Sequence, residues 1–249
     1  MSTVMRTPNP EQQAAIEAAG LVFVSAGAGT GKTLVLVERF VRAVCEQGLS
    51  VDSVLVITYT DRAAGELRSR IRSRLVELGR TDLARELDGA WISTIHGYCH
   101  RLLRAHPFAA GLDPRFRVLD ESQARVIRGE AFEEALTEFC AGDEPERLRL
   151  LGTYGARDLR RMVSGVYETL RSAGRPLELV CDDLGGGPLD VQAERDRGLL
   201  QELLVSFERC YRSAKEQESA LDFEDLQHYA LELLARDDDV ASRERWRFR

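Results

Sequence analysis

The sequence predicts an α/β fold in which a parallel, helix-covered sheet is followed by a mainly helical part. Three observations support this prediction. The first 110 residues repeat a strand–loop–helix pattern three times, a glycine-rich loop follows the first strand, and the remaining residues show helical periodicity without comparable strand patterns. Strands that alternate with helices favour a parallel sheet, because parallel neighbours need a long crossover connection.

The first repeat begins with a short helix over residues 10–19, with Asn9 expected as its cap and Pro10 at its first position. The continuous apolar run 21–24 predicts a strand that is buried on both faces. A glycine-rich loop follows. Apolar residues at helical spacing then predict a helix over 33–46.

The second and third repeats have the same order. The β-branched run 54–59 predicts a buried strand, and it leads into a helix over 61–78 with apolar positions four residues apart. A third short strand, 90–94, precedes a helix over 96–105. These repeats are typical of a sheet whose strands are joined by helices on its faces.

The second part of the chain is predicted to be helical over 122–140, 156–173 and 192–217. The third helix carries an apolar stripe formed by Leu199, Leu203, Phe207 and Tyr211. Residues 182–188, with three consecutive glycines, predict a loop, and residues 221–226 open another helix. A helical subdomain of this size is an economical interpretation.

Composition limits the classes of protein that remain. The 249 residues are 44% hydrophobic, and they contain neither an apolar run long enough to span a membrane nor a signal peptide. The five cysteines are scattered without a Cys-x-x-Cys pair, which favours buried thiols in a reducing cytoplasm over disulfides or a metal site. The net charge is −7, but residues 1–110 carry +2 and residues 111–249 carry −9. Local basic clusters therefore matter more than the total.

Residues 26–33, Ala-Gly-Ala-Gly-Thr-Gly-Lys-Thr, predict a phosphate-binding loop for ATP. Glycines let backbone N–H groups converge on phosphate oxygens, and the following helix adds its positive end. Lys32 is expected to reach the β- and γ-phosphates and the Thr33 hydroxyl to bind Mg²⁺, so both are candidate catalytic residues. The expected nucleotide-binding residues of the loop are Ala26, Gly27, Ala28, Gly29, Thr30, Gly31, Lys32 and Thr33.

Three further segments flank the loop in a recognisable order: 7–16 (TPNPEQQAAI), 54–68 (VLVITYTDRAAGELR) and 92–101 (ISTIHGYCHR). They resemble the Q motif, motif Ia and motif Ib of superfamily 1 helicases of the UvrD/Rep type. The segments TIHGYCHRLLRAHP and FRVLDE are similar to the RecB/AddA-like branch. The resemblance covers essentially the whole chain, and it implies an incomplete RecA-like parallel sheet with an inserted, mainly helical subdomain.

The resemblance also implies roles for single residues. Gln12 would read the adenine edge through a bidentate amide contact; the alternative is a solvated helix glutamine. For Tyr59 the alternative to stacking on a DNA base is packing in the core, and for His96 it is a structural role. The residues implied in DNA binding are Thr58, Tyr59, Thr60, Asp61, Arg62, Thr94, His96 and Tyr98.

Arginines of the helical part form a candidate patch that would face duplex DNA. The patch consists of Arg157, Arg160, Arg161, Arg171 and Arg175.

The family's Walker B segment, an apolar strand ending in Asp-Glu, does not occur in the sequence. Asp182-Asp183 adjoins a glycine-rich loop, and Asp237-Asp238-Asp239 follows a helix, so neither fits that role. We therefore expect an N-terminal piece of a longer protein. Its predicted domains are residues 1–108 (first part of the RecA-like domain), 109–220 (helical subdomain) and 221–249 (return to the RecA-like domain).

The function implied by the resemblance is that of an ATP-dependent DNA helicase or translocase in repair or recombination, with ATP and Mg²⁺ as cofactors. The implied partners are single-stranded and duplex DNA and a RecC/AddB-like protein, with no membrane. The chain by itself is expected to have little or no ATPase activity, because the Walker B residues are lacking. One alternative is a non-catalytic nucleotide- or DNA-binding module. Another, a small-molecule kinase with a helical lid, leaves the Ia- and Ib-like segments unexplained.

Overall fold

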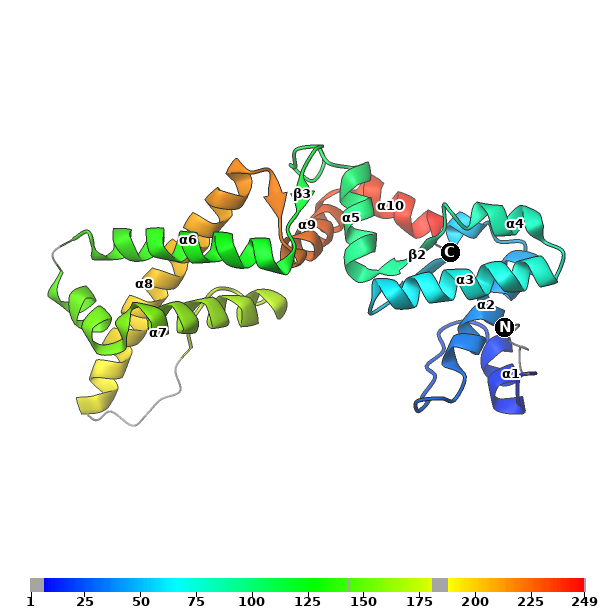
Figure 1. Cartoon of the computed structure of the whole chain (residues 1–249), viewed down its shortest axis with the longest axis horizontal. Coiled ribbons are helices and arrows are strands. Elements are labelled where there is room, and N and C mark those ends of the chain that lie inside the picture. Colours follow the sequence, from blue (N-terminus) through cyan, green and yellow to red (C-terminus); the bar gives the residue numbers. More distant parts are fainter. Residues whose placement is uncertain (1–6, 143, 181–187, 249) are drawn as a thin grey trace. The chain divides into compact units, whose positions relative to one another are not determined.

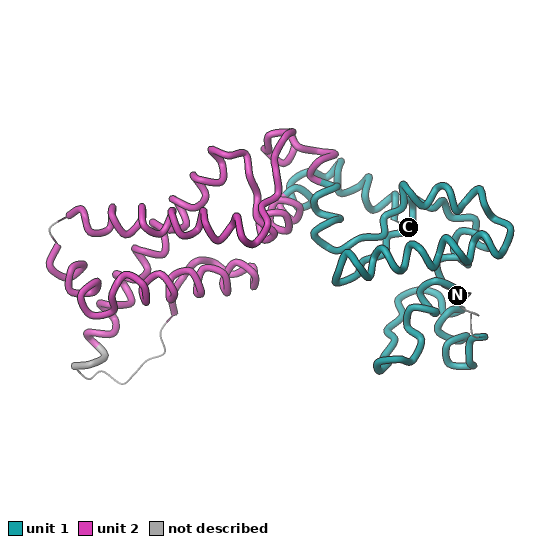
Figure 2. The backbone as a smooth tube through the Cα atoms, viewed as in Figure 1, with its two compact units in different colours: residues 1–102, 233–249 teal, residues 103–232 magenta. Residues whose placement is uncertain are grey.

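A computed structural model describes residues 7–142, 144–180 and 188–248 (Figure 1). By mutual contacts, the chain divides into unit 1, residues 1–102 and 233–249, and unit 2, residues 103–232 (Figure 2). The domain boundaries predicted from the sequence, at 108/109 and 220/221, stay a prediction.

Helices predominate in both units, with a small amount of parallel sheet. Unit 1 contains α1 (Pro10–Glu17), α2 (Lys32–Cys45), a 3₁₀ turn (Val51–Ser53), β1 (Leu55–Thr58), α3 (Asp61–Glu77), α4 (Thr81–Glu86), β2 (Trp91–Thr94) and α10 (Asp238–Arg247). Unit 2 contains β3 (Arg117–Val118), α6 (Glu121–Cys140), α7 (Pro145–Ser172), α8 (Pro188–Gln217) and β4 (Ala220–Leu221). Two helices have residues in both units: α5 (Ile95–Ala105) and α9 (Phe223–Arg236).

The sheet of unit 1 pairs β1 with β2 in parallel, with Leu55 opposite Trp91 and Thr58 opposite Thr94. Both strands and the helices after them were predicted, and the parallel pairing confirms the expected direction. The core forms where α2 and α3 pack together, since each presents one apolar face at helical spacing. Its main residues are Val37, Phe40, Val41, Val44, Ala64, Leu67, Ile71, Leu75 and Ile92.

The prediction of a buried strand over 21–24 is wrong for this structure. The segment lies outside any helix or strand, and Leu21 and Phe23 are almost fully exposed. A buried strand needs neighbours that pair with its N–H and C=O groups. Within the described residues, β1 and β2 pair only with each other, so the segment has no strand to join. The apolar run indicated a strand, but it carried no information about a pairing partner.

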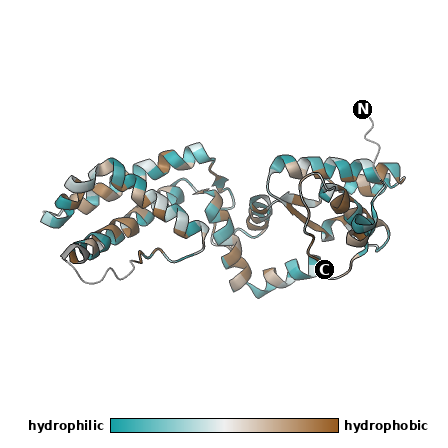
Figure 3. Ribbon diagram, turned by 90° about the horizontal axis from the view of Figure 1, so that it is seen from below, coloured by the Kyte–Doolittle hydropathy of each residue, from teal (hydrophilic) through white to brown (hydrophobic). Residues whose placement is uncertain are grey.

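Unit 2 has a separate core in which α6, α7 and α8 pack together, and Figure 3 shows apolar and polar residues alternating along its helices. Phe207 of α8 lies at its centre, with ring-centroid distances of 5.2 Å to Tyr167 and 6.2 Å to Phe132. Leu203, Phe207 and Tyr211 of the predicted stripe are fully buried, and Leu199 packs against them as a partly buried residue. The stripe is therefore confirmed.

The ends of the helices follow local signals. The bend in α7 lies at Gly155, which has φ +73° and ψ 151°, so the predicted helix start at 156 coincides with the second limb of α7. Asp237 caps α10 by accepting hydrogen bonds from the N–H groups of Asp239 and Val240, both 3.0 Å long. The predicted loop 182–188, with Asp182-Asp183, lies outside the described residues except for Pro188, which begins α8.

Candidate nucleotide and nucleic-acid sites

The glycine-rich loop (residues 26–31) lies between α1 and α2 and is exposed along its length, apart from the half-buried Gly31. Gly29 and Gly31 have φ values of +76° and +87°, a region that glycine enters without strain. None of the loop's backbone N–H groups donates a hydrogen bond to another described residue. Since α2 begins at Lys32, these donors lie beside a helix N-terminus, which is the arrangement that favours an anion.

Lys32 covers the loop with its own side chain. Its Nζ donates hydrogen bonds to the carbonyl oxygens of Ala26 (3.0 Å) and Gly27 (2.6 Å). The Thr30 hydroxyl also donates to Gly27, at 2.8 Å. Thr33 is the second residue of α2 and is half-buried. The ammonium therefore lies at the loop. Phosphate oxygens of a ligand would compete for it with neutral carbonyl oxygens, which are weaker acceptors than an ionised phosphate.

Gln12 contacts the loop from α1. Its Oε1 accepts a hydrogen bond from the Asn9 backbone N–H (2.9 Å), which completes a capping box, and its Nε2 donates to the Thr30 carbonyl (2.8 Å). The alternative of a purely solvated glutamine does not describe this arrangement. Both ends of the amide are engaged, so a bidentate contact with adenine requires Gln12 to release at least one of them.

The residues implied in DNA binding gather at one edge of the β1–β2 sheet. Because the strands are parallel, their carboxyl ends lie together, with Thr58 opposite Thr94. The Thr94 hydroxyl donates to Asp61 Oδ1 (3.3 Å) and accepts from the Gly97 N–H (3.1 Å). Two segments that are far apart in the sequence thus form one surface at the starts of α3 and α5.

Tyr59 is an exposed aromatic residue at this edge. Its side chain is fully exposed, which rules out the alternative of a tyrosine packed in the core. The backbone around it is fixed locally, because the Thr60 hydroxyl accepts a hydrogen bond from the Ala63 N–H (3.1 Å) and the Thr58 hydroxyl donates to the Thr60 carbonyl (3.0 Å). A free aromatic face on a fixed turn suits base stacking.

Tyr98 has a different environment. Its hydroxyl donates to Glu244 Oε2 of α10 (3.2 Å), and its ring packs against Trp91 (5.6 Å between centroids) and Phe248 (6.2 Å). Burial and the Glu244 carboxylate raise the pKa of Tyr98 well above its usual range. His96 is half-buried and has interactions of its own. The side chain of Tyr98, a DNA-binding candidate, is therefore engaged by other residues of unit 1.

Sequence patterns did not predict the group around Trp91. The Arg101 guanidinium lies 3.7 Å from the centroid of the Trp91 ring, and Arg247 lies 5.3 Å from it. Glu244 is only 6% exposed and pairs with Arg247 at 2.9 Å. These residues are about 150 positions apart in the chain, so no local pattern links α5 to α10.

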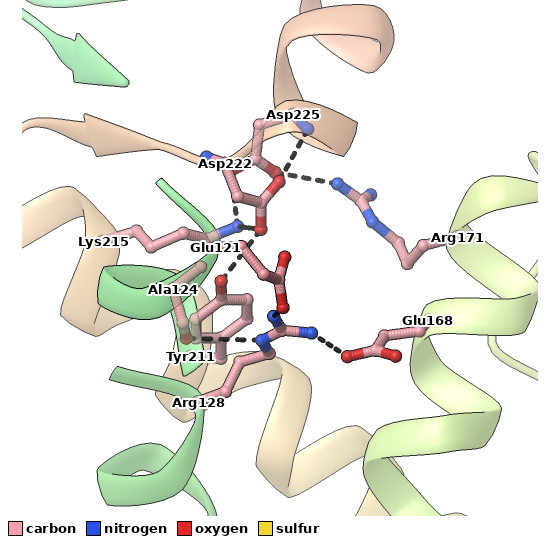
Figure 4. A network of polar contacts seen from close by, with 9 residues as sticks. All are labelled: Glu121, Ala124, Arg128, Glu168, Arg171, Tyr211, Lys215, Asp222 and Asp225. Atoms are coloured by element: carbon pink, nitrogen blue, oxygen red, sulfur yellow. Dashed lines mark hydrogen bonds and ion pairs between the residues drawn. The ribbon is translucent and has the colours of Figure 1, made fainter. Parts of the chain in front are cut away.

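Unit 2 contains a buried polar network around Lys215, one of the two lysines in the chain (Figure 4). Its ammonium bonds to Asp222 (2.9 Å) and to Asp225. The Tyr211 hydroxyl donates to Asp222 (3.0 Å), and Arg171 pairs with Asp225 (2.9 Å). Arg171, included in the candidate patch from the sequence, is therefore an internal ion-pair partner rather than a free surface charge.

Comparison with known protein families shows to which family the chain belongs. Residues 8–249 match the model of the UvrD/REP helicase N-terminal domain. The chain belongs to this family. The match extends from just before α1 to the end of the sequence, so it includes residues of both units.

Three curated relatives are each named as one subunit of an ATP-dependent helicase/nuclease. The Pelotomaculum thermopropionicum protein is 41% identical over 181 residues, covering 67% of this chain and 14% of the relative. The Desulforudis audaxviator protein is 40% identical over 168 residues (61% and 14%). The Desulfitobacterium hafniense (strain DSM 10664 / DCB-2) protein is 32% identical over 235 residues (83% and 17%). The chain thus spans between 14% and 17% of the length of these relatives.

Membership in the UvrD/REP family supports the interpretation of the loop as a nucleotide site. In the described part of the chain, no helix is both long and apolar enough to cross a membrane.

Proposed function

We propose that this chain is the ATP- and single-stranded DNA-binding N-terminal portion of an ATP-dependent DNA helicase or translocase that acts in repair or recombination. The observation that carries the proposal is the exposed loop 26–31, whose unpaired N–H groups adjoin Lys32 at the start of α2. The naming of the relatives as ATP-dependent helicase/nuclease proteins supports the same activity.

The residues of the loop fit ATP with Mg²⁺. Lys32 exchanges the carbonyl oxygens of Ala26 and Gly27 for the β- and γ-phosphates, and Thr33 holds Mg²⁺ through its hydroxyl. Gln12 reads the adenine edge after releasing the Thr30 carbonyl. Bound Mg²⁺ neutralises part of the phosphate charge. Because Gln12 must release the Thr30 carbonyl to read adenine, occupancy of the base site is linked to the conformation of the loop.

Single-stranded DNA binds at the carboxyl edge of β1 and β2. Tyr59 stacks on a base, while Thr58, Thr60, Arg62 and the first N–H groups of α3 contact phosphates. The exposure of Tyr59 and the fixed turn around it support this arrangement. Asp61, Thr94 and His96 complete the DNA-binding edge, and Tyr98 supports it from inside unit 1. Here the proposal departs from the resemblance, which implied that Tyr98 itself contacts DNA.

The remaining proposals concern the larger protein. We propose that unit 1 is part of a RecA-like ATP-binding domain and that the helical unit is a subdomain inserted in it. The complete protein acts on single-stranded and duplex DNA with a RecC/AddB-like partner in the cytoplasm. The relatives' description as one subunit of an enzyme supports such a partner. Without an adjoining Asp-Glu segment, this chain hydrolyses ATP poorly or not at all.

The test compares the full-length protein with its Lys32→Ala variant. We expect DNA-stimulated ATP hydrolysis in the first and its loss in the second, with folding checked by circular dichroism. Equal hydrolysis in both proteins would contradict the proposal. Binding of ATP and DNA without any hydrolysis by the full-length protein would instead support a non-catalytic module. In the 249-residue chain, Lys32→Ala is expected to abolish binding of a fluorescent ATP analogue, whereas rapid turnover by the chain alone would contradict the prediction about the fragment.

A further inference from the structure

A hollow on the surface of unit 2 collects arginines from two helices. It has a volume of about 310 Å³, and residues of α6 and α7 line it. The lining residues are Glu121, Arg125, Arg128, Arg157, Arg160, Arg161, Ser164 and Glu168. The residues of α6 are three or four positions apart, and those of α7 recur at 157, 160–161, 164 and 168, so each set lies on one face of its helix. We call this feature the arginine hollow.

Arg128 fixes one side of the arginine hollow. Its guanidinium pairs with Glu121 (2.8 Å) and with Glu168 and also donates to the Ala124 carbonyl (3.3 Å), so it is neutralised and held in place (Figure 4). The two glutamates of the hollow are both engaged by this one arginine. Arg125 is 3.8 Å from Glu121, near the limit for an ion pair.

Arg157 and Arg160 differ from these residues. In the described part of the chain, neither has a carboxylate within ion-pairing distance, whereas the neighbouring Arg161 pairs with Asp158 at 3.2 Å. Five arginines line the hollow against two glutamates, although residues 111–249 carry a net charge of −9. The positive charge is therefore concentrated in a part of the chain that is acidic as a whole.

The position of Arg160 depends on a glycine in the other helix. A Cβ atom at Gly129 of α6 would lie 2.6 Å from Arg160 Nη2 and 3.2 Å from its Cζ. The guanidinium thus lies against the backbone of α6, where any side chain larger than hydrogen would displace it. Packing between α6 and α7 presents this charge in one place, which a mobile surface arginine would not maintain.

We propose that the arginine hollow binds the phosphodiester backbone of a nucleic acid through Arg157 and Arg160. Guanidinium groups bind phosphate oxygens through paired N–H donors, and two unneutralised guanidiniums beside a fixed third suit adjacent phosphates. Contacts of this kind position a nucleic acid without reading its sequence. The proposal deepens the proposed function and rests on it for the identity of the anion, and it adds a second contact surface in a different unit from Tyr59.

The test measures binding of labelled duplex and labelled single strands to the 249-residue chain by fluorescence anisotropy at several salt concentrations. The variant Arg157→Gln/Arg160→Gln is compared with Arg115→Gln/Arg195→Gln, which removes equal charge from exposed arginines of unit 2 that belong neither to the hollow nor to the patch expected from the sequence. For the first variant, the slope of log affinity against log salt is expected to become shallower by about 2, one unit for each lost phosphate contact. The control variant should retain the original slope.

A second pair of variants leaves every charge in place. Gly129→Ala is expected to weaken nucleic-acid binding by displacing Arg160, whereas Gly165→Ala, at an exposed position of α7 with open space around it, should not. Circular dichroism checks that both variants fold. If Arg157→Gln/Arg160→Gln folds and binds with the affinity and slope of the control, the proposal is wrong.

Competitors identify the kind of anion. Unlabelled duplex or single strand is expected to displace the labelled nucleic acid, and the more effective of the two identifies the form that the hollow prefers. Equal displacement by a polyglutamate peptide, or by inorganic phosphate at the same concentration of charge, would overturn a phosphodiester site. Binding of the fluorescent ATP analogue is measured in parallel. If Arg157→Gln/Arg160→Gln keeps the wild-type salt slope while the wild-type chain binds the ATP analogue, the hollow alone is refuted. If the slope becomes shallower as expected but the wild-type chain does not bind the analogue, the proposed nucleotide site alone is refuted.

Discussion

Individual residues set the conformation of the glycine-rich loop. Gly31 has φ +87° and lies so close to Gln12 that an added Cβ would be 2.5 Å from Nε2. Lys32 and Gln12 both donate to loop carbonyls, which leaves the loop's N–H groups for a ligand. The functional importance of Gly31 thus has two separable physical causes, its backbone conformation and its contact with α1.

Gly31→Ala is expected to abolish binding of a fluorescent ATP analogue to the chain. The substitution combines strain at positive φ, on the order of 1 kcal/mol, with a clash that expels Gln12. Gly20→Ala is the matched control, because Gly20 has φ +75° but open space around it. Gly20→Ala should bind the analogue nearly as well as the wild type. Undiminished binding by Gly31→Ala would show that the Gln12 contact is dispensable.

Lys215→Met is expected to lower the free energy of unfolding of unit 2 by about 3 kcal/mol, because it leaves two buried carboxylates without their cation. Lys32→Met, at the only other lysine, removes an exposed ammonium and should cost much less. Urea unfolding followed by circular dichroism measures both. Similar losses in the two variants would mean that the Lys215 network does not stabilise the fold.

The loss caused by Lys215→Met is expected to shrink on acidification. In the wild type, burial raises the pKa of Asp225 despite Lys215, whereas at Asp222 the effect of burial is outweighed by Lys215 and the pKa is lowered. Removing the lysine raises both folded-state pKa values. Groups with raised pKa values stabilise the fold at low pH and lose that contribution as pH rises. The deficit should therefore be smaller at about pH 4 than at pH 7. A deficit independent of pH would contradict this linkage.

At the scale of secondary-structure elements, α5 and α10 are joined by the Tyr98–Glu244 hydrogen bond and by packing around Trp91. Tyr59, in contrast, is exposed on the turn between the end of β1 and the start of α3. Two tyrosines from neighbouring motifs therefore have opposite environments. One is available to a ligand, and the other holds two helices together.

Tyr59→Ala is expected to weaken binding of single-stranded DNA by about 1–3 kcal/mol, the range for loss of one base–aromatic stack. Tyr98→Phe should leave that affinity unchanged but reduce the thermal stability of unit 1, because the buried Glu244 carboxylate loses a donor. Anisotropy and thermal melts separate the two effects. Weaker DNA binding by Tyr98→Phe with unchanged stability would restore Tyr98 as a DNA contact.

At the scale of the whole molecule, the two units have cores that share no residue. The chain passes between the units at 102/103 and again at 232/233. Both tryptophans, Trp91 and Trp246, lie in unit 1, so their fluorescence reports that unit alone. Separate cores allow the units to lose structure at different denaturant concentrations.

Lys215→Met is therefore expected to separate two unfolding signals. Circular dichroism, to which the long helices of unit 2 contribute strongly, should change at a lower urea concentration than in the wild type. Tryptophan fluorescence should keep its wild-type midpoint, because Trp91 packs in unit 1. Coincident shifts of both signals would show instead that the units unfold as one cooperative block.

The sequence alone determined the features that depend on local spacing. Helical periodicity predicted α2, α3 and the stripe of α8, the Asn9 cap and Pro10 predicted the start of α1, and the glycine-rich loop was evident from its residues. The UvrD/REP relationship also followed from motif order. Each of these signals involves residues that are close together in the chain, so no knowledge of the fold was needed.

Only the tertiary structure decided which distant residues meet. An apolar run predicted a strand at 21–24, but a strand forms only when a neighbour pairs with it, and none of the described strands does so. Tyr59 and Tyr98 both belong to segments implied in DNA binding, yet Glu244 of α10 engages only Tyr98. The arginine hollow likewise depends on α6 packing beside α7, because Gly129 admits Arg160. Such contacts depend on packing between elements, which spacing within one element does not encode.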